Sequence, residues 1–325
     1  MDIDAKLRPL YLLQILQERT DEDNYLTTAQ LASILKQRYG MEPHRTTIKG
    51  DIEVLQQAGF GIDERRSTQN QYRYLEREFE IAELKTMIDA IASSKFIPEE
   101  KSDALIKKVT ALAGIYKARD LKRNVVVDGR GKLENKQIFY IIDTINEAIN
   151  QHKKIRFRKI EYNVKKERVL HHGGEKYTFS PYSLVWDGDN YYVVGYSDKY
   201  ENIGSHRVDR IAEQPEILDE PAVPPKAGFS VEKYVKTTFR MYNAPRKEVE
   251  LLCDNGVMDA IIDQFGPDVH TYAGDLQNFR VIEEVAVGKV FFNWIFGFEG
   301  KVRIKAPADV KEQYRQMVEN AAKVL

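Results

Sequence analysis

Cysteine is almost absent from this chain of 325 residues, which contains one, Cys253. A single thiol excludes a disulfide within the chain and any zinc site built from several cysteines. Long apolar runs are also missing, and none approaches the ~20 residues that a membrane-spanning helix needs. The first four residues carry two aspartates, whereas a secretory signal begins with positive charge. We therefore expect a cytoplasmic protein that makes no contact with a membrane.

An excess of charge of either sign is missing as well. The chain has 49 lysine and arginine residues against 50 aspartate and glutamate residues, which gives a formal net charge of -1. Many nucleic-acid-binding proteins are basic overall. Affinity for DNA nevertheless depends on where the cations lie, because each cation beside a phosphate releases a counterion locally. The neutral balance therefore leaves nucleic-acid binding open, and the length predicts two or three domains.

Residues 1–75 predict three short helices followed by a β-hairpin. Apolar residues at helical spacing indicate the first helix. Thr27 and Gln30 have the spacing of a capping box, which predicts the start of the second. A third helix is predicted over residues 44–57, and a hairpin with a polar tip over residues 62–74. Three helices and then a hairpin are the order of a winged helix-turn-helix DNA-binding domain.

The third of these helices has an apolar face formed by Ile48, Ile52 and Leu55 and an opposite face that carries cations. Arginine and lysine donate to guanine or phosphate, and threonine contacts a phosphate or a thymine methyl group. The alternative is that these side chains are ordinary solvated surface charges. The candidate DNA-binding residues are Arg45, Thr46, Thr47 and Lys49 on the helix, with Arg65 and Arg66 on the hairpin.

The rest of the chain predicts three further parts of an α+β multidomain protein. Residues 76–133 predict a helical linker built on a pair of helices, which would act as a spacer or a dimerisation element. Residues 134–220 predict an amphipathic helix and about five short strands, an arrangement that suggests a small β-barrel. Residues 221–325 predict a β-α-β-β-α-β order, which is that of a ferredoxin-like module.

Two arginines, Arg207 and Arg210, lie close together in the sequence, and guanidinium groups can bind phosphate through paired hydrogen bonds. On a straight strand the two side chains would point to opposite faces, so a joint site requires a bulge or a strand end between them. The alternative is that both arginines pair with an aspartate, namely Asp187, Asp189 or Asp209. Nearby tyrosines would then be ordinary half-buried strand residues.

Three parts of the chain resemble known families. The segment from His44 to Ile52 resembles the recognition helix of DeoR-like winged-helix regulators, with His44 at the usual serine position and Gly50 at a usual arginine position. The segments 180–186, 191–196 and 206–211 together resemble the WYL domain, although Tyr191-Tyr192-Val193 stands where that family has Trp-Tyr-Leu. Segments in residues 251–254, 264–266, 293–297 and 302–307 resemble the WCX extension that follows WYL domains.

These resemblances imply a fold and a set of partners. A WYL domain implies an Sm-like β-barrel that binds an anionic ligand, such as a nucleotide or single-stranded nucleic acid, in a basic pocket. A WCX extension implies dimerisation. The ligand-binding residues that follow from the WYL resemblance are Ser180, Tyr182, Tyr192, His206, Arg207 and Arg210.

Signals for catalysis are weak. We find no phosphate-cradling P-loop and no convincing pair of nucleophile and base. Cys253 sits in an apolar strand pattern, where a thiol is usually inert. The adjacent His171 and His172 would point apart on a strand, and no third metal ligand is evident. We therefore expect no enzyme activity, no cofactor and no metal.

Two functions are consistent with the sequence. The first is a ligand-responsive transcriptional regulator, acting as a homodimer on double-stranded DNA with two-fold symmetric sites. The second is a nucleic-acid-associated accessory protein or enzyme in which the winged helix mediates protein contacts. A negative potential over residues 44–57 would favour the second.

Overall fold

The computed structural model describes residues 3–66, 68–123 and 137–324, and the chain divides into two compact units, 1–134 and 135–325. Its described residues form a mixed α+β structure with eleven α-helices and four antiparallel sheets. None of the described helices combines the length and the hydrophobicity that crossing a membrane requires. The predicted boundary between residues 133 and 134 lies outside the described residues.

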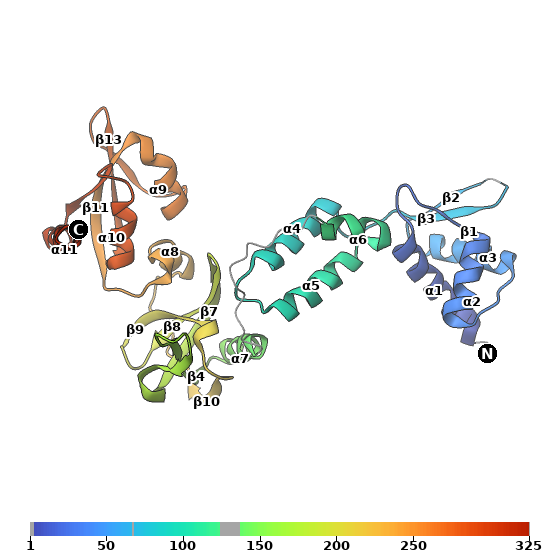
Figure 1. Ribbon diagram of the computed structural model, residues 1–325, viewed down its shortest axis with the longest axis horizontal. Helices are drawn as coiled ribbons and strands as arrows, with labels where there is room; N and C mark the ends of the chain where they lie inside the picture. The colour runs from blue at the N-terminus through green and yellow to red at the C-terminus, as the bar shows by residue number, and fades with distance from the viewer. Residues whose placement is uncertain (1–2, 67, 124–136, 325) are drawn as a thin grey trace. The chain divides into compact units, whose positions relative to one another are not determined.

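Three helices and a small sheet make up the first part of unit 1–134 (Figure 1). The sheet has the strand order β1-β3-β2, so the hairpin β2–β3 is extended by a short third strand. The elements are α1 (Ile3–Arg19), β1 (Leu26–Thr27), α2 (Thr28–Tyr39), α3 (Arg45–Gln57), β2 (Ile62–Arg65) and β3 (Gln71–Tyr74).

The capping box predicted at the start of α2 is confirmed. The hydroxyl of Thr27 accepts a hydrogen bond from the backbone N–H of Gln30, and the Gln30 side chain accepts one from the N–H of Thr27. Two of the otherwise unpaired N–H groups at this helix end are thereby satisfied. The helix ends at Gly40, whose φ of 70° is in the left-handed region that glycine adopts easily.

One apolar core holds these elements together. The α3 residues that the sequence assigned to the core are all buried, and they pack with α1, α2 and the hairpin. An ion pair between Arg8 on α1 and Asp51 on α3, both about 85% buried, fixes α3 further. The buried residues of this cluster are Leu12, Ile15, Leu16, Leu26, Leu31, Leu35, Met41, Ile48, Ile52, Leu55, Ile62 and Tyr72.

The helical segment that follows contains three helices rather than the predicted pair. These are α4 (Ile81–Ser93), α5 (Glu99–Ala111) and α6 (Gly114–Arg123). Helices α4 and α5 run side by side, and α6 contacts both of them (Figure 1). Leu84, Ile88, Ala113 and Leu121 form their small core.

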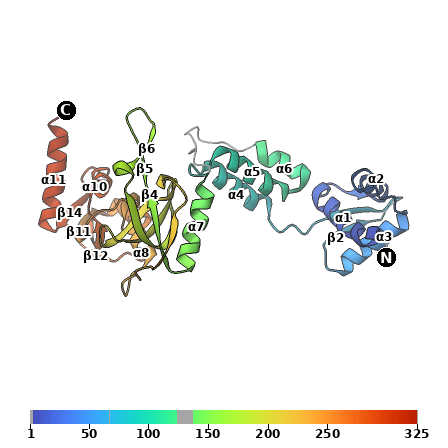
Figure 2. The same ribbon diagram turned by 90° about the horizontal axis from the view of Figure 1, so that it is seen from below.

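Unit 135–325 begins with α7 (Ile138–Asn150), which packs against the five-stranded sheet and has Ile141 and Ile145 among its buried residues (Figure 2). The sheet is antiparallel throughout, in the order β10-β4-β7-β8-β9. A separate hairpin, β5 (Ile160–Tyr162) and β6 (Arg168–Leu170), follows β4. The sheet strands are β4 (Lys153–Arg158), β7 (Lys176–Asp187), β8 (Asn190–Ser197), β9 (Asn202–Arg207) and β10 (Glu216–Pro221).

The same unit ends in a second sheet, of four antiparallel strands in the order β12-β13-β11-β14. Cys253 lies on its strand β11 and is completely buried, and burial raises the pKa of its thiol to about 12, so the thiol stays protonated. The elements are α8 (Val231–Lys236), β11 (Arg246–Asp254), α9 (Met258–Phe265), β12 (Thr271–Ala273), β13 (Asn278–Ala286), α10 (Lys289–Phe296), β14 (Val302–Ala306) and α11 (Ala308–Ala322).

Candidate functional site

Helix α3 presents a polar face to solvent. Its first turn is capped by His44, whose imidazole Nδ1 accepts from the N–H of Thr46. Because the apolar residues of α3 recur every three or four positions, they bury one face and leave the cations on the other. Arg45, Thr46 and Lys49 are exposed, and Thr47 is half-buried.

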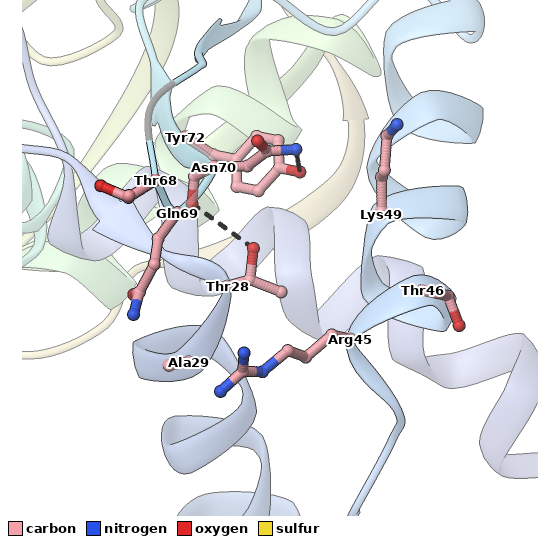
Figure 3. Close-up of a pocket in the computed structure, with 9 residues that line it drawn as sticks. All are labelled: Thr28, Ala29, Arg45, Thr46, Lys49, Thr68, Gln69, Asn70 and Tyr72. Atoms are coloured by element: carbon pink, nitrogen blue, oxygen red, sulfur yellow. Dashed lines mark hydrogen bonds between the residues drawn. The ribbon is translucent and has the colours of Figure 1, made fainter.

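A hollow of about 230 Å³ lies between α3, the start of α2 and the tip of the β2–β3 hairpin (Figure 3). The guanidinium of Arg45 extends from the start of α3 toward Ala29, and Lys49 lies one turn further along the helix. Three elements that are distant in sequence therefore line one hollow. Its lining residues are Thr28, Ala29, Arg45, Thr46, Lys49, Thr68, Gln69, Asn70 and Tyr72.

Hydrogen bonds fix the wall of this hollow opposite α3. The backbone carbonyl of Asn70 accepts from the N–H of Thr28 at 3.2 Å and from its hydroxyl at 3.4 Å. The Asn70 amide donates to Glu64 at 2.8 Å and to the hydroxyl of Tyr72 at 3.4 Å. Thr28 and Asn70 were not among the residues predicted from the sequence, although the polar hairpin tip was the signal that could have pointed to Asn70.

The cations around the hollow are largely available to a partner. Among the described residues, Arg45 has no carboxylate within 4 Å. Lys49 lies 3.7 Å from Glu53 with about half of its side chain exposed. Exposed ion pairs of this kind contribute little and are readily exchanged. On the hairpin, Arg65 is exposed, and the side chain of Arg66 is 81% exposed at 3.5 Å from Glu64.

A second group of candidate residues lies where β9 ends. Arg207 is the last residue of β9, and a 3₁₀ turn from Val208 to Arg210 follows it. The strand end that a joint site of Arg207 and Arg210 requires is therefore present. Both guanidinium groups converge on Asp209, whose side chain is 2% exposed.

The contacts of Asp209 are asymmetric. Arg207 donates two hydrogen bonds to its carboxylate, at 3.0 and 2.9 Å, whereas the Nε of Arg210 lies 3.6 Å from it. Arg210 also stacks over the ring of Tyr162, 4.7 Å from the ring centroid. The pairing of both arginines with an aspartate, one of the alternatives that the sequence left open, is thus present, and Asp209 is the aspartate. Two guanidinium groups and one carboxylate leave a net charge of +1 at this position.

The other predicted ligand residues are distributed around the sheet. Tyr192 is the cross-strand partner of Arg207 and is 7% exposed. Ser180 is completely buried, and its hydroxyl accepts from the N–H of Val223 at 3.0 Å. Tyr182 packs against Phe229, with ring centroids 5.8 Å apart. Arg207, Arg210 and Tyr192 thus lie close to one another, whereas the contacts of Ser180 and Tyr182 are with Val223 and Phe229.

His206 faces away from Arg207, because successive side chains of a strand point to opposite faces. The residue is 8% exposed, and the centroid of its ring lies 5.3 Å from that of Phe157 and 4.8 Å from that of Phe179. Burial, together with the nearby charge of Lys159, lowers the pKa of His206 to about 3. The imidazole is therefore neutral at physiological pH and is part of an aromatic core.

This low pKa predicts that acid destabilises the protein. The unfolded chain, in which the pKa of His206 is near its ordinary value of 6.5, binds a proton more readily than the folded chain. This contribution to stability is therefore complete above pH 6.5 and is lost as the pH falls below it, by up to about 1.4 kcal/mol per pH unit. Between about pH 7 and pH 5, it amounts to about 2 kcal/mol.

Urea unfolding of the wild type and of His206→Phe at these two pH values tests this expectation. Phenylalanine suits a site between Phe157 and Phe179 and does not titrate, so the wild type should lose about 2 kcal/mol more than the variant on acidification. An equal loss in both proteins would show that His206 is not the titrating group.

The structure corrects the expected geometry of His171 and His172. These residues lie in a 3₁₀ turn rather than a strand, and His172 has a φ of 46°. Their rings consequently stack, with centroids 3.8 Å apart, instead of pointing apart. Their Nδ1 atoms lie 3.0 and 3.5 Å from the hydroxyl of Tyr177. Among the described residues, no group of three or more histidine, cysteine, aspartate or glutamate side chains is arranged to hold a metal ion.

Solved structures that are similar to this chain include two at low sequence identity. The proteasome accessory factor B/C (PafBC) of Arthrobacter aurescens is 14% identical, with a TM-score of 0.32 over 96% of this chain and 48% of its own. A CRISPR Cas-related protein is also 14% identical, with a TM-score of 0.38 over 99% of this chain and 83% of its own. The present chain thus spans about half the length of the first.

No curated protein is similar enough to count as a match. The family model of the WYL domain, in contrast, matches residues 140–216. These residues include most of α7, strands β4 to β9 and the turn that holds Asp209 and Arg210. Four of the five strands of the sheet, together with the arginine pair at the end of β9, therefore lie within a WYL domain, and the match ends at the first residue of β10.

Proposed function

We propose that this protein is a DNA-binding transcriptional regulator that responds to an anionic effector. The observation that carries the proposal is the exposed face of α3, where Arg45 and Lys49 border a hollow that also reaches the hairpin tip. A helix that enters the major groove contacts base edges through its first exposed residues, and phosphates on either side are held by cations. Arg45, Thr46, Thr47 and Lys49 would meet the major groove, and Arg65 and Arg66 the adjacent backbone or minor groove.

The order of the secondary-structure elements in the N-terminal and C-terminal parts of the chain supports this proposal. Helices α1 to α3 and the sheet β1-β3-β2 are the elements that a DeoR-like winged helix-turn-helix domain would contain. The order β12-β13-β11-β14 is the one that a ferredoxin-like β-α-β-β-α-β chain adopts. We assign residues 1–75 to DNA binding, 76–133 to a helical linker, 134–220 to an Sm-like WYL domain and 221–325 to a WCX-like domain.

The effector would bind at the arginine pair of the WYL domain. Arg207 and Arg210 carry two positive charges against the one negative charge of Asp209, and Tyr162 offers an exposed ring beside Arg210. Guanidinium groups and aromatic rings recognise phosphate and bases, so the effector would be a nucleotide or single-stranded nucleic acid. Its binding would shift the population of DNA-competent homodimers, with no catalytic step.

The experiment that tests the proposal is selection of duplexes from a random-sequence pool, followed by gel-shift titration of the selected duplex at several salt concentrations. We expect a selected duplex to bind at least about 1,000 times more tightly than random DNA, with an affinity that falls steeply as salt rises. Failure to enrich any duplex would contradict DNA recognition and would favour an accessory protein that uses α3 for protein contacts.

A further inference from the structure

Gly50 is placed where glycine lowers the stability of the protein for no internal reason. It is the sixth of the 13 residues of α3, in the interior of the helix. Glycine is less favourable than alanine at such a position by about 1 kcal/mol, because the unfolded glycine backbone has more freedom to lose. A reason for its presence must therefore be sought in its surroundings.

The fold does not supply that reason. A β-carbon built on Gly50 meets no neighbouring atom of the described chain within 4 Å, and the φ of this residue is not in the left-handed region. Each of the other glycines in residues 3–66, 68–123 and 137–324 has either a left-handed φ or a protein atom within 4 Å of that position. At Gly195, for example, the carbonyl oxygen of Ser180 lies 2.1 Å from the β-carbon position. Gly50 is the exception.

The position of Gly50 on α3 shows which face of the helix it occupies. Residues four apart on a helix share a face, so Gly50 lies one turn beyond Thr46, and Glu53 follows on the same side. The buried residues Ile48 and Ile52 occupy the opposite face. Gly50 therefore lies on the outward side of α3, where it is partly exposed, and it is not one of the residues that line the hollow with Arg45 and Lys49. A side chain there would project directly toward whatever α3 contacts.

We infer that Gly50 allows close approach of the α3 backbone to base edges in the major groove of DNA. A β-carbon at this position would hold the helix away from the bases, whereas the flanking Arg45 and Lys49 can reach phosphates at longer range. The inference rests on the proposed function, because it takes double-stranded DNA as the partner of α3. It adds that residue 50 sets the depth of the helix in the groove and hence the sequence preference.

We expect the substitution Gly50→Ala to raise the thermal stability of the protein and to lower its affinity for the selected duplex. Alanine favours the helix and meets no atom of the protein, so the midpoint of thermal unfolding should rise by about 2–6 °C. Affinity for the duplex that the wild type selects should fall at least about fivefold, the effect of losing a favourable base contact. Affinity for random-sequence DNA should change less than about twofold, because it depends on phosphate contacts.

A matched control is Thr86→Ala, an exposed position of α4, which also replaces a residue of lower helix propensity by alanine. This control should raise the unfolding midpoint and leave both affinities unchanged. A Gly50→Ala variant that is more stable and binds the selected duplex as tightly as the wild type would overturn the inference and leave DNA recognition intact. A less stable variant would also overturn it, because glycine would then be required by the fold. A wild type that selects no duplex would instead overturn the proposed function.

Discussion

Replacing Arg45 and Lys49 together by alanine should weaken binding to the selected duplex about 100-fold at moderate salt. Both side chains lie on the exposed face of α3 and border the hollow shared with α2 and the hairpin (Figure 3). Neither is needed for packing, so the fold should be retained. Each lost phosphate contact should also reduce the slope of log affinity against log salt by about one.

A second double variant with the same change in net charge separates the effect of where the cations lie from the effect of net charge. Lys107 and Lys108 are exposed on α5, and replacing both by alanine changes the net charge by the same amount. This control should bind DNA as the wild type does, because a neutral overall chain attracts DNA only where its cations are concentrated. Equal loss in the two double variants would mean that long-range charge, rather than the face of α3, determines binding.

The sequence is sufficient to predict elements that depend on local chemistry. The capping box fixes the start of α2 because Thr27 and Gln30 satisfy each other's backbone groups, and both are within one helical turn. The apolar period of α3 likewise identifies its buried face. Helix α6 escaped prediction as a separate helix: Leu121 on it is buried in the helical core, but its other large apolar residues, Ile115 and Tyr116, are about half exposed.

The candidate sites depend on contacts that local pattern does not contain. The hollow exists because the N–H of Thr28 bonds to the carbonyl of Asn70, 42 residues away, which brings the hairpin tip to the start of α2. Motif similarity grouped His206 with Arg207, yet strand alternation directs the two side chains to opposite faces. Because the strand ends after Arg207 and a 3₁₀ turn follows, the side chains of Arg207 and Arg210 both reach Asp209.

The arginine pair yields a second prediction with a large effect. Replacing both Arg207 and Arg210 by alanine should lower the free energy of unfolding by about 3–5 kcal/mol, because Asp209 would remain buried with no cation to pair with. In the described residues, these two arginines are the only cations within 4 Å of its carboxylate. A simple test of effector binding with this double variant would therefore confuse loss of ligand contacts with loss of folding.

The triple variant Arg207→Gln, Asp209→Asn, Arg210→Gln separates the two effects. Amides keep most of the volume and the hydrogen-bonding capacity of the cluster while they remove all three charges, so most of the lost stability should return. Binding of a fluorescent single-stranded oligonucleotide, followed by anisotropy, should remain at least about tenfold weaker than in the wild type, because no guanidinium is left to hold a phosphate. If the triple variant folded normally and bound the oligonucleotide as the wild type does, the anion site would have to lie elsewhere. If the double alanine variant were as stable as the wild type, Asp209 would not depend on its two arginines, and their convergence would serve the ligand alone.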